Sequence, residues 1–394
     1  MSGNILNNLF VRQEPFERVR EWIESPGEGE IVINGLFSSS KAFAMAAAMT
    51  RGLHIVLLND PDDAAYCAGD LSSLLDEESV YYFPVSANTR ARRESNDASL
   101  KVQRTAALKA VSDFLKGEGK TERVVLIAYP QSVAEKVIPE KMLDSALLTL
   151  SKGNSISHGF LRETLAEYGF TKVDFVQEPG EFAIRGGIID LFSYSDPQPY
   201  RIDFFGDTVE SITLFDIESQ RSLKEVDSLD ILPDIHNLRQ QEGITDIFSF
   251  GRHEFICWIT DPAYFPAKLK DIEEEQETDR DNGDREENRA SRSLLECRRV
   301  LFGTGSKSGI LTSSYNVTFH TTPQPSFNKN FELLAEEISG RYNEGFKVFI
   351  LCSSKSQEER LKQIFSMMEG VKKAFETLTL SIHEGFTDHN SKIC

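Results

Sequence analysis

Apolar residues in the first third of the chain follow two alternating spacings. Short strands are expected at residues 30–34, 53–58 and 123–129. Helical spacing of apolar residues occupies the stretches 16–23, 41–51 and 100–116. Strands that alternate with helices predict a mostly parallel sheet with helices on its faces. We therefore expect an α/β domain at the start of the chain.

The pattern changes in the middle of the chain, where three strands are expected in a row. They occupy residues 182–192, 200–205 and 208–215. The second of them alternates strictly, with Tyr200, Ile202 and Phe204 on one face and Arg201, Asp203 and Phe205 on the other. Successive strands without intervening helices predict an antiparallel unit inserted into the α/β domain.

A hairpin closes this antiparallel region. Gly206-Asp207 predicts a two-residue turn. The turn would place Phe204 opposite Val209 and Asp203 opposite Glu210. The sheet carries arginines and exposed aromatic residues but no pattern of a catalytic site, which indicates a docking surface.

The end of the chain returns to alternating helices and strands. A helical stripe at residues 331–338 precedes an expected strand at 346–352. Ser356-Gln-Glu-Glu359 predicts a capping box that opens a second helix, and a further strand is expected at 378–382. We expect a partial α/β domain here.

Composition excludes several classes of protein. The 394 residues carry a formal net charge of −19, which argues against a chain built mainly to hold phosphate backbones. The cysteines form no close pair, and His383 and His389 lack helical spacing and a third ligand, so we expect no metal site. No apolar run reaches the length of a membrane span, and no basic-then-apolar leader is apparent. We expect a cytoplasmic protein with no membrane partner.

A loop after the first strand has the spacing of a phosphate-binding loop but lacks two of its residues. Strand 31–33 leads into Gly35-Leu-Phe-Ser-Ser-Ser-Lys41-Ala42 and then a helix, the context of a Gly-x4-Gly-Lys-Ser/Thr motif. Ser40 replaces the second glycine, which lets backbone amides close around phosphates. Ala42 replaces the hydroxyl that binds magnesium. We expect a degenerate loop of Gly35, Ser40, Lys41 and Ala42, with weak anion binding at Lys41 as the alternative.

Other charged residues have simpler interpretations. Asp190 and Asp203 are expected to pair with the sheet arginines rather than act as acid and base. Arg90, Arg92 and Arg93 stand in a short polar segment, and a solvated patch is favoured over contact with DNA because the chain is acidic.

Two stretches of the antiparallel region resemble a known family of repair proteins. Gly180-Glu-Phe-Ala-Ile-Arg-Gly186 fits a Gly-x-Phe-x-Val/Ile-Arg-Gly strand, and Arg201-Ile-Asp-Phe-Phe-Gly-Asp207 fits an Arg-Ile-x-Phe-Phe-Gly-Asp hairpin. Together they resemble the second domain of the transcription-repair coupling factors (Mfd) and, more distantly, of the excision-repair protein UvrB. Further family-like stretches are Tyr82-Phe-Pro84, Ser219-Gln-Arg-Ser222 and residues 95–104, 229–233 and 322–334. The degenerate loop also resembles the coupling factors, because UvrB has an intact one.

The resemblance implies a protein partner and the residues that hold it. In the family this surface binds UvrA. Arg185 falls on the second arginine of UvrB's Phe-Arg-x-Arg pattern, whereas Ala183 replaces the first. Lys172 lies close to the position of another contact arginine. We expect UvrA contacts from Arg185, Phe182, Lys172 and Arg201.

The resemblance also implies a division of the chain and a role. We expect a UvrB-like α/β domain at 1–135 and 219–322, a UvrA-docking domain at 138–218 and the partial α/β domain at 331–394. The implied function is recruitment of UvrA to stalled RNA polymerase in transcription-coupled nucleotide excision repair. In the complete family protein an ATP-dependent DNA translocase follows, so RNA polymerase and double-stranded DNA are its further partners. We expect this chain itself to be no enzyme and to need no cofactor.

Two other classes of function stay open. A nucleotide-hydrolysing enzyme would need a working loop at residues 35–42, and a DNA-binding module would need a basic groove.

Overall fold

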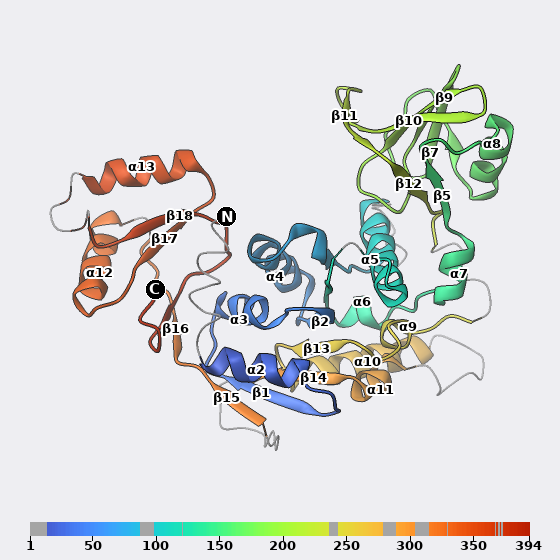
Figure 1. Ribbon diagram of the computed structural model, residues 1–394. Coiled ribbons are helices and arrows are strands. Elements are labelled where there is room, and N and C mark those ends of the chain that lie inside the picture. The colour runs from blue at the N-terminus through green and yellow to red at the C-terminus, as the bar shows by residue number, and fades with distance from the viewer. Residues whose placement is uncertain are drawn as a thin grey trace.

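The described part of the chain folds into three units (Figure 1). The computed structural model describes residues 14–86, 98–119, 121–235, 243–278, 289–303, 315–328, 330–366, 368, 371 and 373–394. A unit built on a large parallel sheet lies in the centre, and an antiparallel unit and a small α/β unit stand on opposite sides of it. The fold class expected from the sequence is confirmed.

The central unit contains a seven-stranded sheet in which all neighbouring strands are parallel. Its order is β15-β1-β14-β13-β2-β4-β3. The strands are β1 (Glu30–Asn34), β2 (Gly52–Leu57), β3 (Val80–Tyr82), β4 (Arg123–Ala128), β13 (Ile256–Ile259), β14 (Arg298–Phe302) and β15 (Tyr315–Thr318). Strands β1 to β4 precede the antiparallel unit in sequence and β13 to β15 follow it. The antiparallel unit is therefore an insertion.

Helices cover both faces of this sheet, because successive strand residues point to opposite sides. Ile31 and Ile33 face a core shared with α2 (Glu14–Glu24), α3 (Ser40–Ala48) and α4 (Pro61–Leu74). Val32 faces a second core, to which most of the remaining helices contribute. These are α5 (Ala98–Lys116), α6 (Pro130–Ala134), α7 (Glu140–Ser145), α9 (Ile247–Phe250), α10 (Tyr264–Thr278) and α11 (Ala290–Glu296), while the 3-10 turn η1 (Glu77–Ser79) precedes β3. Among the described residues, no helix combines the length and apolar character needed to cross a bilayer.

The antiparallel unit is a six-stranded sheet with one helix on its inner face. The order is β11-β10-β9-β8-β7-β6, and only β6 and β7 are parallel. The strands are β6 (Thr171–Lys172), β7 (Glu181–Arg185), β8 (Ile188–Leu191), β9 (Tyr200–Phe205), β10 (Thr208–Phe215) and β11 (Ser222–Val226). Helix α8 (His158–Glu167) packs Leu161 and Leu165 against Ile202. A ribbon of β5 (Leu148–Ser151) and β12 (Ser228–Ile231) leads back to the centre.

The structure corrects two details of this region and bears on a third. The single strand expected at 182–192 is a hairpin, because Gly186, with φ at +61°, turns the chain between β7 and β8. Phe204 does lie opposite Val209, but a bulge at Glu210 places Asp203 opposite Ser211 instead. Strands β11 and β12, which the expected boundary at 218 excluded, pair with β10 and β5. We therefore propose that the docking unit extends to the end of β12.

The third unit is a small α/β layer. Strands β17 (Phe349–Cys352) and β18 (Glu376–Thr379) are parallel and pack on α12 (Phe331–Asn343) and α13 (Lys355–Ser366). Strands β16 (Thr321–Pro323) and β19 (Phe386–Asp388) form an antiparallel pair beside them. The capping box expected at Ser356 is wrong, since α13 begins at Lys355 and Ser354 accepts the backbone N–H of Gln357 at 3.2 Å.

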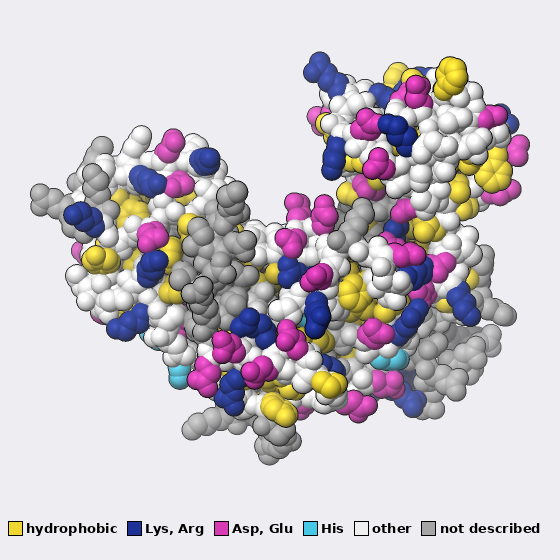
Figure 2. All heavy atoms as spheres, viewed as in Figure 1, with side chains coloured by type: hydrophobic (Ala, Val, Ile, Leu, Met, Phe, Trp, Pro, Cys, Tyr) yellow, Lys and Arg dark blue, Asp and Glu magenta, His cyan; other side chains and the backbone are white. Residues whose placement is uncertain are grey.

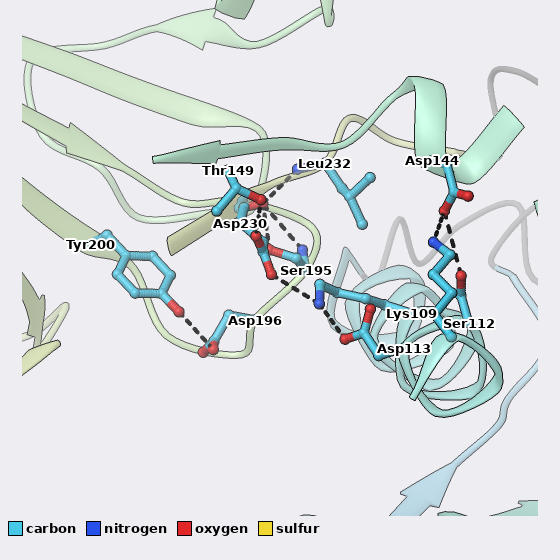
Figure 3. A network of polar contacts seen from close by, with 12 residues as sticks. Lys109, Ser112, Asp113, Asp144, Thr149, Ser195, Asp196, Tyr200, Asp230 and Leu232 are labelled. Carbon is cyan, nitrogen blue, oxygen red and sulfur yellow. Dashed lines mark hydrogen bonds and ion pairs between the residues drawn. The ribbon is translucent and has the colours of Figure 1, made fainter. Parts of the chain in front are cut away.

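Helix α5 holds the antiparallel unit to the centre through three lysines. Lys101, Lys109 and Lys116 follow one another at intervals of about two helical turns. Lys101 pairs with Asp234 at 2.8 Å. Lys109 pairs with Asp230 at 2.8 Å (Figure 3), and Lys116 pairs with Asp144. These aspartates lie on the two chain segments that enter and leave the antiparallel unit. The ion pairs therefore hold both connecting segments against α5.

Removal of Lys109 is expected to weaken this junction. Burial disfavours its charged amine, but hydrogen bonds to Asp113 and Asp230 outweigh that effect and raise its pKa. Lys109→Met would leave both carboxylates without this donor, so we expect a loss of about 1.5–3 kcal/mol in the free energy of unfolding. Urea denaturation followed by circular dichroism measures it. Lys152→Met, at an exposed pair with Glu225, is the matched control, and equal losses in both variants would contradict a special role for Lys109.

Candidate protein-docking surface

The face of the six-stranded sheet that points away from α8 carries two arginines around one aspartate. Ala183, Asp190 and Arg201 lie side by side across β7, β8 and β9. Arg185 follows Ala183 by two positions and so points to the same face. The alternation of these strands therefore brings together both arginines that the sequence singled out.

Asp190 is the centre of this cluster. Its side chain is fully buried and accepts hydrogen bonds from Nε of Arg201 at 2.7 Å and from Nη2 at 3.0 Å. Arg185 donates to the same carboxylate. A buried carboxylate needs such donors, because an unpaired charge in the interior is strongly destabilising. The two guanidinium groups therefore have defined positions.

The two arginines differ in exposure. Arg201 is 18% exposed, lies over the ring of Phe215 at 4.9 Å, and donates to the carbonyl of Gln220 at 3.2 Å. Its hydrogen bonds to Asp190 raise its pKa. Arg185 is 39% exposed and donates to the carbonyl of Asp174 at 3.1 Å. Arg185 is thus open to a partner, whereas Arg201 mainly supports Asp190.

The other two expected contact residues are placed differently. Lys172 is exposed on β6, at the edge of the sheet next to β7. Phe182 is 3% exposed and packs in the core with Leu161 and Leu165, so it is not a surface contact. The reason is strand alternation, since Phe182 and Arg185 are three positions apart and point to opposite faces. Phe182 instead supports the sheet from behind.

The sequence reasoning missed Phe175 as a surface residue. Its side chain is 60% exposed, and the guanidinium of Arg185 lies 5.3 Å from its ring centre. An exposed aromatic beside a positioned arginine is typical of the residues that anchor protein interfaces. Phe175 follows the short strand β6 in a segment with no alternation, so periodicity carried no signal for it.

The loop that the sequence analysis expects to be a degenerate phosphate loop lies in the central unit, after β1. Gly35 has φ at +75°, and a Cβ there would lie 1.9 Å from the carbonyl oxygen of Phe319. This glycine is therefore required by a close approach of the chain itself. Ala42 is buried, and Lys41 lines a polar cavity of about 350 Å³ that also contains Asp63, Asp70 and Asp261.

The loop uses its own backbone amides. The N–H of Ser40 donates to the carbonyl of Phe37 at 3.1 Å, and that of Lys41 donates to Ser38 at 3.4 Å. The N–H of Phe37 donates to the hydroxyl of Ser40 at 2.9 Å. Burial lowers the pKa of Lys41, while Asp63 and Asp261 oppose that shift. The amides of Phe37, Ser40 and Lys41 therefore donate within the loop, and three carboxylates line the same cavity as Lys41.

Comparison with known proteins identifies the antiparallel unit. Residues 148–236 match the UvrB interaction domain, a range that ends just after β12. The transcription-repair coupling factor of Escherichia coli K12 is 37% identical over 127 residues, which are 32% of this chain and 11% of the relative. The chain is related to the transcription-repair coupling factors.

Other coupling factors match a longer part of the chain. That of Bacillus subtilis 168 is 27% identical over 231 residues, 55% of this chain and 19% of the relative. That of Staphylococcus aureus USA300 is 29% identical over 230 residues, 58% of this chain and 19% of the relative. The resemblance seen in the sequence is confirmed. The aligned parts span less than a fifth of these coupling factors, so the activities of the complete proteins are not transferred by similarity.

The cluster around Asp190 predicts a stability effect. Asp190→Ala would leave two guanidinium groups without their shared acceptor, so we expect the free energy of unfolding to fall by about 2–3 kcal/mol. Chemical denaturation followed by circular dichroism measures this. Asp203→Ala is the control, because Asp203 lies on the same face and accepts one hydrogen bond from the hydroxyl of Ser211. A loss as large in the control would show that Asp190 contributes no more to the free energy of unfolding than Asp203 does.

Proposed function

We propose that this chain binds UvrA through the outer face of its antiparallel unit. We propose further that it thereby recruits UvrA to stalled RNA polymerase in transcription-coupled repair. The observation that carries the proposal is Arg185, held by buried Asp190 and exposed beside Phe175 within a UvrB interaction domain. Lys172 pairs with Phe182 in register and so points to the inner face, which leaves Arg185 as the positive charge that carries the proposal. Contacts with RNA polymerase and double-stranded DNA are proposed for the complete family protein.

The geometry favours a protein partner for a physical reason. A guanidinium that is already oriented loses little side-chain entropy on binding, so more of its interaction energy appears as affinity. Arg185 can donate to a carboxylate of the partner while Phe175 offers apolar contact, the combination found at interface hot spots. Arg201 and Phe182 contribute by holding the sheet rather than by touching the partner.

Direct binding of DNA is the less favoured function. Acidic and basic side chains are interspersed over the face shown in Figure 2, and the chain as a whole carries a net charge of −19. Affinity for a phosphate backbone requires several cationic side chains along one surface. The arginines at positions 90, 92 and 93, considered for this role, lie outside the described residues.

We also propose that this chain does not hydrolyse ATP. Turnover requires phosphates wrapped by amides and a magnesium ion held by a hydroxyl. Ala42 has no hydroxyl, and the amides of Ser40 and Lys41 already donate within the loop. Asp63, Asp70 and Asp261 line the cavity beside Lys41, and their negative charge opposes an anion.

Binding to purified UvrA tests the first proposal. Arg185→Ala is expected to weaken binding by about 10- to 100-fold, the usual cost of removing an interface hot spot. Isothermal titration calorimetry measures it, with circular dichroism to verify the fold. The control is Arg162→Ala, because Arg162 is an exposed arginine on α8, behind the sheet. Unchanged binding by the Arg185 variant, or an equal loss in the control, would contradict the assignment.

A phosphate-release assay tests the second proposal. The purified chain with ATP and magnesium is expected to release phosphate at the background rate, and Lys41→Ala is expected to behave identically. Turnover that disappears in the Lys41 variant would show a working site and overturn the proposal.

A further inference from the structure

The loop at residues 35–42 contacts a segment near the C-terminal end of the chain, at residues 383–384. The backbone N–H of Glu384 donates to the hydroxyl of Ser39 at 3.0 Å. The preceding N–H, of His383, donates to Oδ1 of Asp70 on α4 at 2.6 Å. Two consecutive amides of the segment between β18 and β19 are thus bound by side chains of the central unit.

Burial and ring contacts support this pairing. Ser39 and Asp70 are each 5% exposed, so both acceptors are buried, whereas His383 and Glu384 are exposed residues. The ring of His383 stacks on that of Tyr66, with centres 3.6 Å apart and planes 15° apart. Three residues after His383, Phe386 meets Phe43 of α3 edge to face at 5.3 Å. Polar and aromatic contacts therefore hold the same segment.

The loop also holds the segment that leads into the C-terminal unit. The hydroxyl of Ser40 lies 3.2 Å from that of Thr321, and Thr321 donates to the carbonyl of Gly35 at 3.0 Å. Thr321 begins β16, which pairs with β19. A glycine at position 40, as the phosphate-loop pattern requires, would have no hydroxyl for this contact. The substitution that weakens the phosphate pattern thus supplies a contact with the C-terminal unit.

We propose that the loop at residues 35–42 and the neighbouring helix α4 form a docking site within the chain, in which Ser39 and Ser40 of the loop and Tyr66 and Asp70 of α4 bind the C-terminal α/β unit. We call this set the serine clasp. The ligand is the backbone of residues 383–384, recognised through two amides, together with the strand start at Thr321. The carboxylate of Glu384 lines the same cavity as Lys41, so the bound segment and a nucleotide phosphate would compete for one space. The clasp joins the C-terminal unit to the central unit independently of any contact with UvrA.

Hydrogen–deuterium exchange of the intact chain tests the clasp directly. A peptide that contains His383 and Glu384 is read out by mass spectrometry. Ser39→Ala and Asp70→Ala each remove one acceptor, so exchange of this peptide is expected to accelerate roughly tenfold, the equivalent of one hydrogen bond. Peptides from β2 and β4 should keep their protection.

Two further variants separate the clasp from a general loss of stability. Asp70→Asn keeps a side-chain oxygen for the amide of His383, and we expect it to retain most of the protection. Ser79→Ala removes an equally buried hydroxyl, which donates to the carbonyl of Asp76, and should leave the peptide unchanged. Unchanged exchange in both Ser39→Ala and Asp70→Ala would overturn the proposal. Acceleration of the same size in Ser79→Ala would overturn it as well.

Discussion

The docking face depends on one buried charge. Asp190 has almost no contact with water, so its carboxylate is stable only while Arg185 and Arg201 donate to it. Asp190 lies directly beside Arg201 of β9 and diagonally from Arg185 of β7, with one guanidinium over Phe215 and the other at the surface beside Phe175. The order of the strands brings Asp190 close to both arginines. The ion pairs then hold Arg185 in a defined orientation while it stays partly exposed.

Contacts of charged and polar side chains also join the three units. Lysines of α5 pair with aspartates on both segments that connect the antiparallel unit to the centre, and the serine clasp binds the segments that connect the C-terminal unit. At each junction, charged or polar side chains of the central unit bind a short segment that passes from one unit to the next. The orientation of the docking face therefore depends on contacts far from it, at the base of the ribbon formed by β5 and β12.

Periodicity predicted most of the elements and part of the site. The alternation of β9 and the turn at Gly206-Asp207 correctly placed Phe204 opposite Val209, because side chains on a strand repeat every two residues. The bulge at Glu210 has no signature in the spacing of apolar and polar residues. The same alternation places Phe182 on the face opposite Arg185, in the core. Partners such as Lys101 and Asp234, 133 positions apart, cannot be paired from sequence spacing, because only the folded sheet brings them together.

The most direct test of the docking surface is a cross-link made at Phe175. A photoreactive benzoyl-phenylalanine in place of Phe175 lies beside Arg185 on the outer face, whereas the same group in place of Phe160 lies on α8, behind the sheet. Both phenylalanines are more than half exposed, so each site is open to a partner. The proposed docking surface predicts a cross-link to UvrA from position 175 and none from position 160. A cross-link from position 160 alone would contradict it.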